Sequence, residues 1–105
     1  MTRIEDTAMA KQFKALAHPR RMRIFRLLAE QPEVGRSFLS LQETTRLCHS
    51  SLSHHLREMV LCGVIRRRRR GTYMTFSLET SALTTAIREV LHLRRPRSVA
   101  ARRAA

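Results

Sequence analysis

The side chains with the richest chemistry lie in one short segment, residues 48–55, which holds a thiol, three imidazoles and three serine hydroxyls. Thiolate and imidazole are ligands for zinc and copper, and a Cys–His pair serves some enzymes as nucleophile and base. Cys48 and His49 are neighbours, as are His54 and His55, and neighbouring side chains on a helix point about 100° apart. No third residue is placed to orient a catalytic histidine. We therefore predict no enzyme activity, no metal in this segment and no cofactor.

A second cluster, residues 66–70, consists of five consecutive arginines. Alternate side chains of a strand point to opposite faces, so Arg66, Arg68 and Arg70 are expected to face the same way. The planar guanidinium binds phosphate and guanine in a bidentate manner. A hydrophobic strand start precedes the run and a glycine follows it, which favours an ordered hairpin over a merely solvated stretch of charge.

The composition agrees with a polyanionic partner. The chain has 105 residues, 43% of them hydrophobic, which suffices for one modest core. Its 21 basic residues exceed the 8 acidic ones, giving a formal net charge of +13, and only Lys11 and Lys14 are lysines. A surface of this charge predicts nucleic acid as the partner, although an arginine-rich genome would also favour arginine over lysine.

The sequence shows no signal for a membrane or for secretion. No apolar run approaches the roughly 20 residues that a transmembrane helix needs, and the first residues are polar and of mixed charge, unlike a signal peptide. Two cysteines without framework spacing are typical of a reducing compartment. We expect a cytoplasmic protein.

Apolar spacing predicts five helices. The first covers residues 7–17 and the second residues 19–30, where Met22, Phe25 and Leu28 are expected to be buried. Ser40 and Glu43 form the pattern of a capping box, which predicts a third helix over residues 41–47. The fourth is expected to be capped by Ser50 or Ser51 and to end at Gly63, with a buried stripe of Leu52, Leu56, Met59 and Val60.

Beyond Gly63 the pattern becomes alternating, with Met74, Phe76 and Leu78 on one side and Tyr73, Thr75 and Ser77 on the other, which predicts a strand. Residues 64–69 are its expected partner, and Gly71 is the expected turn. A fifth helix, with Leu83, Ile87, Val90 and Leu91 on one face, should end before Pro96. We expect one domain over residues 1–95 and a disordered basic tail over residues 96–105.

These elements predict a mainly α fold with a small β-hairpin: a winged helix-turn-helix of five helices and a two-stranded wing. A helix or a two-stranded ribbon fits the major groove of DNA, so double-stranded DNA is the expected partner. The fourth helix would read bases and the wing would hold phosphates. The candidate DNA-binding residues are His49, Ser50, Ser51, Ser53, His54, Arg57, Arg66, Arg68, Arg70 and Tyr73.

Two stretches, FKALAHPRRMRI over residues 13–24 and SSLSHHLREM over residues 50–59, resemble the signature stretches of the ArsR/SmtB family of bacterial winged helix-turn-helix repressors. The resemblance extends over about residues 11–93. It implies a homodimer that binds a near-palindromic operator, represses transcription and is released by an inducer. The dimer interface would then involve apolar faces of the first and last helices, including Met9, Phe13, Leu83, Ile87 and Val90.

The family's usual metal sites are missing from this chain. Ser37 and Leu39 occupy the positions of its Cys-x-Cys pair, and neither supplies a thiolate. The positions of its last-helix site are Thr80, Ala82, Leu93 and Pro96. Metal sensing is therefore not expected, and the inducer stays unidentified.

Two alternatives remain open. Cys48 lies at the start of a helix, where the dipole favours thiolate, so a thiol-responsive repressor that switches through Cys48 is one. Cys62 cannot pair with it in one protomer, because the helix between them spans about 20 Å against a limit of about 7 Å. The other is a nonspecific nucleic-acid-binding protein, although Tyr73 is the only stacking aromatic residue on the wing.

Overall fold

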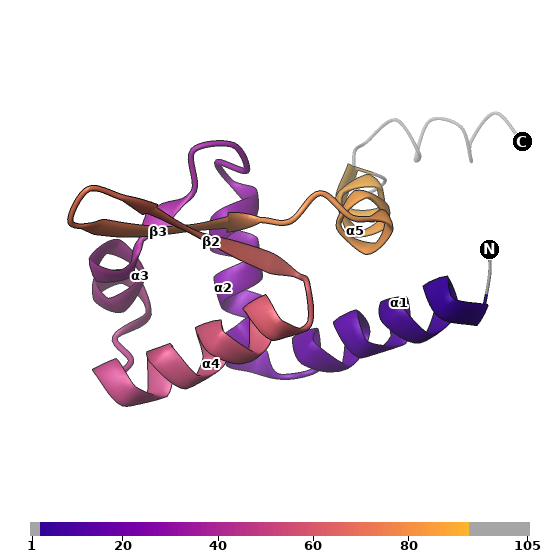
Figure 1. Cartoon of the computed structure of the whole chain (residues 1–105), viewed down its shortest axis with the longest axis horizontal. Helices are drawn as coiled ribbons and strands as arrows, with labels where there is room; N and C mark the ends of the chain where they lie inside the picture. The colour runs from indigo at the N-terminus through magenta and orange to yellow at the C-terminus, as the bar shows by residue number, and fades with distance from the viewer. Residues whose placement is uncertain (1–2, 93–105) are drawn as a thin grey trace, which may run out of the picture.

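A computed structural model describes residues 3–92. The predicted tail, 96–105, and the position before Pro96 at which the last helix was predicted to end lie outside the described residues. The element order is α1 (Arg3–Leu16), α2 (Pro19–Ala29), β1 (Arg36–Ser37), α3 (Phe38–Thr45), α4 (His49–Leu61), β2 (Ile65–Arg70), β3 (Tyr73–Leu78) and α5 (Ala82–His92). Five helices and a β2–β3 hairpin confirm the predicted winged helix-turn-helix. Figure 1 shows the hairpin lying over α3 at one end, and α1 and α5 together at the other.

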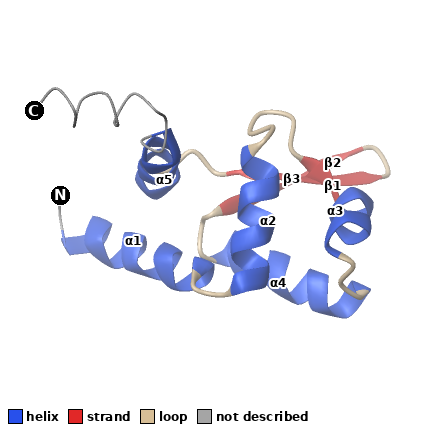
Figure 2. Ribbon diagram, turned by 180° about the vertical axis from the view of Figure 1, so that it is seen from behind, coloured by secondary structure: helices blue, strands red, loops and turns tan. Residues whose placement is uncertain are grey.

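The core is built around α2, which Figure 2 shows between α1 and the hairpin end of the molecule. Ile24, Phe25 and Leu28 are completely buried. The burial of Phe25 and Leu28 confirms the prediction, but the inclusion of Met22 was wrong, because Met22 is 37% exposed and Ile24 takes its place. Outside α2, the core contains Ala15, Leu16, Leu41, Leu52, Leu56, Met59, Val64, Ile65, Phe76, Leu78 and Leu83.

The helix α2 begins at Pro19 as predicted, whereas α1 begins at Arg3 instead of residue 7, and α3 and α4 also begin earlier than predicted. Ser37 is the N-cap of α3, and its Oγ accepts a hydrogen bond from the amide of Ser40 at 3.1 Å. The predicted capping box at Ser40 was therefore wrong, since a serine three residues earlier already caps the helix. Cys48, not Ser50 or Ser51, is the N-cap of α4. By contrast, Gly63 follows α4 with φ +78°, as predicted for a left-handed residue.

The hairpin belongs to a three-stranded antiparallel sheet of order β1-β3-β2. Gly71 lies in the turn with φ +61°, which confirms the predicted turn position. The partner strand runs one residue further along the chain than predicted, because the Ile65↔Leu78 pair begins the ladder and Arg70↔Tyr73 ends it. The two-residue β1 was not predicted, since so short a strand has no periodicity of its own.

Gly35 lets β1 approach β3. Its φ of +73° lies in the left-handed region, and a Cβ on it would meet the backbone oxygen of Phe76. Only glycine satisfies both conditions without strain. The entrance to β1 and α3 therefore depends on this residue.

Candidate nucleic-acid interface

The buried stripe of α4 decides which of its side chains face outward. Leu52, Leu56 and Met59 are at most 2% exposed, and Val60 packs against the same cluster. On the remaining faces His49, Ser50, His54 and Arg57 are exposed, while Ser51 and Ser53 are half-buried. The structure thus brings the six residues proposed from α4 to one accessible helix surface.

His49 is held in place at the first turn of α4. Its ring lies 4.7 Å from that of Phe38, centroid to centroid, and its Nδ1 lies 3.4 Å from Oγ of Ser53. Phe38 is the first residue of α3, so this contact joins the two helices of the helix-turn-helix. Phe38 was not among the predicted site residues, because its apolar side chain gave no sign of a positioning role.

Cys48 is exposed, and its Sγ lies 3.5 Å from Oγ of Ser50. The hydroxyl of Ser50 and, after it, the amide of Ser51 lower the pKa of the Cys48 thiol below its usual value. Cys62 is the C-cap at the opposite end of the same helix, and both cysteines are free. This placement agrees with the expectation that the two thiols cannot pair within a protomer.

His55 occupies the opposite side of α4 from the accessible surface and is 6% exposed. The Nε of Arg21 donates a hydrogen bond to its Nδ1 at 3.1 Å, and its ring lies 4.7 Å from that of His18 and 5.8 Å from that of His54. Burial lowers the pKa of His55, and the positive charge of Arg21 lowers it further. A neutral His55 therefore joins α2 to α4, a role that the sequence did not reveal.

All five arginines of β2 are exposed, and the register divides them between two faces. Residues directly opposite each other in a ladder share a face. Arg66, Arg68 and Arg70 lie opposite Ser77, Thr75 and Tyr73, so the prediction that these three arginines share a face is confirmed. The remaining two arginines, Arg67 and Arg69, lie opposite Phe76 and Met74.

The hairpin is thus basic on both faces. Tyr73 is 70% exposed at its tip, while Arg66 also donates a hydrogen bond from Nε to Ser77 Oγ at 3.4 Å. Arg67 was not among the predicted site residues, yet it lines the same groove as His49, Ser53 and Arg57 of α4. The groove therefore joins α4 to the face of the hairpin that holds Arg67, while Arg66, Arg68 and Arg70 lie on the other face.

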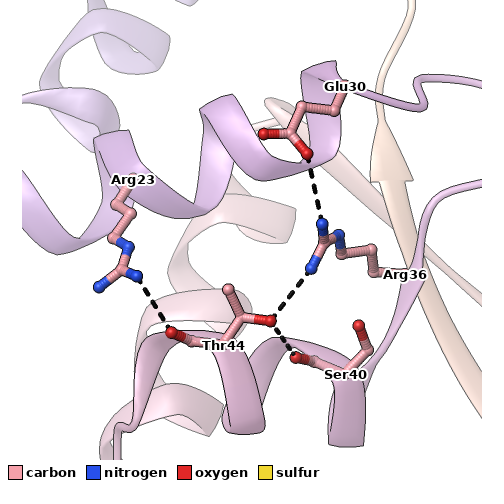
Figure 3. A network of polar contacts seen from close by, with 5 residues as sticks. All are labelled: Arg23, Glu30, Arg36, Ser40 and Thr44. Atoms are coloured by element: carbon pink, nitrogen blue, oxygen red, sulfur yellow. Dashed lines mark hydrogen bonds and ion pairs between the residues drawn. The ribbon is translucent and has the colours of Figure 1, made fainter.

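A polar network fixes α3 against α2 and β1 (Figure 3). Arg23 donates to the backbone oxygen of Thr44 at 3.0 Å, and Arg36 donates to Thr44 Oγ1 at 3.1 Å. The other nitrogen of Arg36 forms an ion pair of 3.3 Å with Glu30, and Thr44 Oγ1 donates to the Ser40 oxygen at 2.9 Å. Because α3 precedes α4 by a short turn, this network helps to set the position of α4.

The residues expected at a dimer interface fall into three groups. Phe13 and Val90 are 52% and 60% exposed, and Met9 and Ile87 are half-buried against the core. Leu83 is only 1% exposed, so its inclusion was wrong: it is part of the protomer's own core. An accessible apolar surface nevertheless remains on α1 and α5.

In the described part of the chain, no cluster of metal-ligating side chains lies at the positions of the family's usual metal sites. Ser37 caps α3 and Leu39 is 62% exposed. Among residues 3–92, no three His, Cys, Asp or Glu side chains gather as a metal site would require. None of the helices within that range is both long and apolar enough to cross a membrane.

Comparison with known proteins decides the family. A family model described as a helix-turn-helix domain matches residues 16–68, about half of the chain. The crystal structure of Rv0081 from M. tuberculosis is 32% identical, with a TM-score of 0.68 and coverage of 91% of this chain and 92% of that one. A predicted DNA-binding transcriptional regulator from E. coli is 30% identical, with a TM-score of 0.67 and coverage of 80% and 86%.

The chain belongs to this helix-turn-helix family, and its structural neighbours support the resemblance to ArsR/SmtB regulators. A third structure, the homodimeric winged helix-turn-helix domain of Mb0332 from Mycobacterium bovis, described as a possible ArsR-family transcriptional regulator, has a TM-score of 0.72 and 23% identity. It covers 87% of this chain and 82% of its own. A comparison with curated protein sequences found no significant match. This protein is a winged helix-turn-helix DNA-binding transcriptional regulator.

Proposed function

We propose that this protein is a dimeric repressor that binds a near-palindromic operator, with α4 in the major groove and the β2–β3 hairpin on the phosphate backbone. The observation that carries the proposal is the shared surface of α4 and the hairpin, in which His49, Ser53 and Arg57 adjoin Arg67. Base edges are read by short polar side chains and by arginine, whereas phosphates need only positive charge. The two parts of the surface match these two tasks.

A homodimer is proposed from the apolar surface on α1 and α5 and from the homodimeric M. bovis relative. Figure 1 shows α1 and α5 at the end of the molecule away from the hairpin, so pairing through them leaves the DNA surface free. Two-fold symmetry then requires symmetric half-sites about one helical turn of DNA apart. Sedimentation of the wild type and of a Phe13→Asp variant, whose new charge should weaken pairing, tests the interface.

The test of the repressor function is a footprint on the promoter of the gene that encodes this protein. Titrations of the protected duplex and of a scrambled duplex of equal length then compare the two affinities. We expect a near-palindromic protected stretch and at least about 1,000-fold tighter binding to it than to the scrambled duplex. Equal affinity for both would instead identify a nonspecific nucleic-acid-binding protein. His54→Ala should reduce this preference by about 1–3 kcal/mol if His54 contacts a base edge.

A thiol-responsive repressor is the second candidate, favoured by the exposed Cys48 with its lowered thiol pKa beside Ser50. Hydrogen peroxide would convert the thiolate to a sulfenic acid, with the other peroxide oxygen leaving as hydroxide. The added oxygen at the first turn of α4 would weaken operator binding. Peroxide should then release wild-type protein but not Cys48→Ser, while Cys62→Ser responds as the wild type does; an identical response of all three proteins would exclude the switch.

A further inference from the structure

A groove of about 550 Å³ lies between α4, the start of α3 and the hairpin. Its walls are mostly apolar, and six side chains supply them: Phe38, Leu56, Val60, Leu61, Met74 and Phe76. Sites for small molecules typically have volumes of about 300–1,000 Å³, apolar walls and a few polar groups that orient the ligand. The groove has these properties although it adjoins a surface for DNA.

Beside the polar side chains of His49 and Ser53, the groove has two guanidinium groups. Arg57 comes from α4 and Arg67 from β2, and both are exposed. Within the described residues, neither guanidinium has a hydrogen bond or an ion pair, in contrast to Arg36, which is paired with Glu30. Two unpaired positive charges beside an apolar wall are complementary to a molecule with an apolar body and one anionic group.

DNA alone does not account for this arrangement. Phosphates would satisfy the two guanidinium groups, but they would leave the apolar wall facing water, including Leu61, which is 71% exposed. A second copy of the chain does not account for it either, because the apolar surface of α1 and α5 lies at the other end of the molecule (Figure 1). An amphipathic small molecule satisfies both the wall and the charges.

We propose that this groove binds a small amphipathic organic anion, a carboxylate or sulfonate with an apolar body, whose charged group lies between Arg57 and Arg67. Because both arginines belong to the surface proposed for DNA, such a ligand competes with the operator and acts as an inducer. The competition rests on the proposed function, whereas binding of the ligand does not.

The test of binding uses the full chain and 1-anilinonaphthalene-8-sulfonate, a fluorescent aromatic sulfonate. We expect saturable, blue-shifted emission that octanoate displaces and uncharged octanol does not. Arg67→Gln should weaken binding at least about tenfold, since it removes a charged hydrogen-bond partner. Arg68→Gln is the matched control, because it removes the same charge from the opposite face of the hairpin, where Arg68 lies opposite Thr75.

A second pair of variants tests the apolar wall. Leu61→Glu places a negative charge in the groove and should abolish binding of the sulfonate, while Leu39→Glu should not, because Leu39 lies on α3 outside the groove. Leu61 and Leu39 are 71% and 62% exposed, so both variants should fold, as circular dichroism would verify. Equal affinities across either pair would overturn the proposal, since the probe would then bind elsewhere.

Operator binding is measured separately, first without and then with octanoate. Octanoate should lower the affinity of the wild type for the duplex and should have a much weaker effect on Arg67→Gln. Simultaneous binding of octanoate and duplex would overturn the inducer role. A chain that binds the sulfonate as described but binds no duplex at all would instead refute the proposed function and leave the ligand site standing.

Discussion

The Nε of Arg21 donates a 3.1 Å hydrogen bond to Nδ1 of His55, and this bond joins the first turn of α2 to the buried side of α4. The acceptor must be unprotonated, so the contact exists only with a neutral imidazole. Arg20, His18 and His54 surround the same ring with further positive or protonatable groups. The position of the proposed reading helix therefore depends on the charge state of one histidine.

Stability should fall in mild acid for this reason. The folded-state pKa of His55 is lowered, so the unfolded chain takes up a proton first, at an ordinary pKa of about 6.5. The contribution of His55 is then fully present above that pH and decreases as the pH falls below it. Urea unfolding between pH 8 and pH 5 should show this loss, and His55→Gln should make the pH dependence shallower; an unchanged slope would contradict the assignment.

Arg21→Gln should destabilise the protein by about 1–3 kcal/mol, because it leaves the buried Nδ1 of His55 without its charged donor. Arg20→Gln is the control, since the Arg20 side chain has no hydrogen-bond partner among the described residues. Its bond to His18 is donated by the backbone amide, which the substitution retains. Urea denaturation measures both variants at pH 7.5. Equal losses would show that the effect comes from charge and not from the bond to His55.

The wing arginines should set the salt dependence of DNA binding. Each phosphate contact contributes about 0.9 to the slope of log affinity against log salt concentration, so Arg68→Gln combined with Arg70→Gln should reduce the slope by up to about 1.8. Binding to operator and to scrambled duplex should weaken by similar factors. Lys11→Gln on α1, which lies away from the hairpin, is the control and should leave the slope unchanged.

Substitutions at two glycines should distinguish the cost of a strained backbone from the cost of a steric clash. Gly35 and Gly71 both have positive φ, but a Cβ would meet the Phe76 backbone at Gly35 and nothing at Gly71. Gly71→Ala should therefore cost about 1–2 kcal/mol, the usual penalty of the left-handed conformation. Gly35→Ala should cost more, because β1 must also move away from β3. Chemical denaturation compares the two, and equal losses would contradict the close approach of the strands.

The sequence predicted those parts of the fold in which a periodic pattern of apolar residues extends over many positions. The α4 stripe spans more than two turns, and the alternation of β3 spans six residues, so both patterns outweigh local exceptions. Met22 was misplaced because Met22 and Ile24 are both apolar, and only the packing of α2 shows which one the core covers. The start of α3 was misplaced because Ser37 and Ser40 have the same capping ability.

The site residues were predictable where exposure follows from periodicity, as for His54 and Arg57, and unpredictable where it depends on register. Arg67 joins the groove because it pairs with Phe76, a relationship between strands that no local pattern contains. Phe38 and His55 act through contacts with other elements. Leu83 and Val90 were both placed on the apolar face of the last helix, yet Leu83 is buried in the core and Val90 is 60% exposed, a difference that apolar spacing alone does not show.

Because β2 lies at the edge of the sheet, its arginines also affect whether another chain can pair with that edge. An edge strand exposes unpaired backbone groups that another chain can extend, and this is a common route to aggregation. A second β2 approaching this edge would bring five more positive charges against residues 66–70, on both faces at once. The same charges that attract a polyanion thus protect the monomer from adding strands to its own sheet.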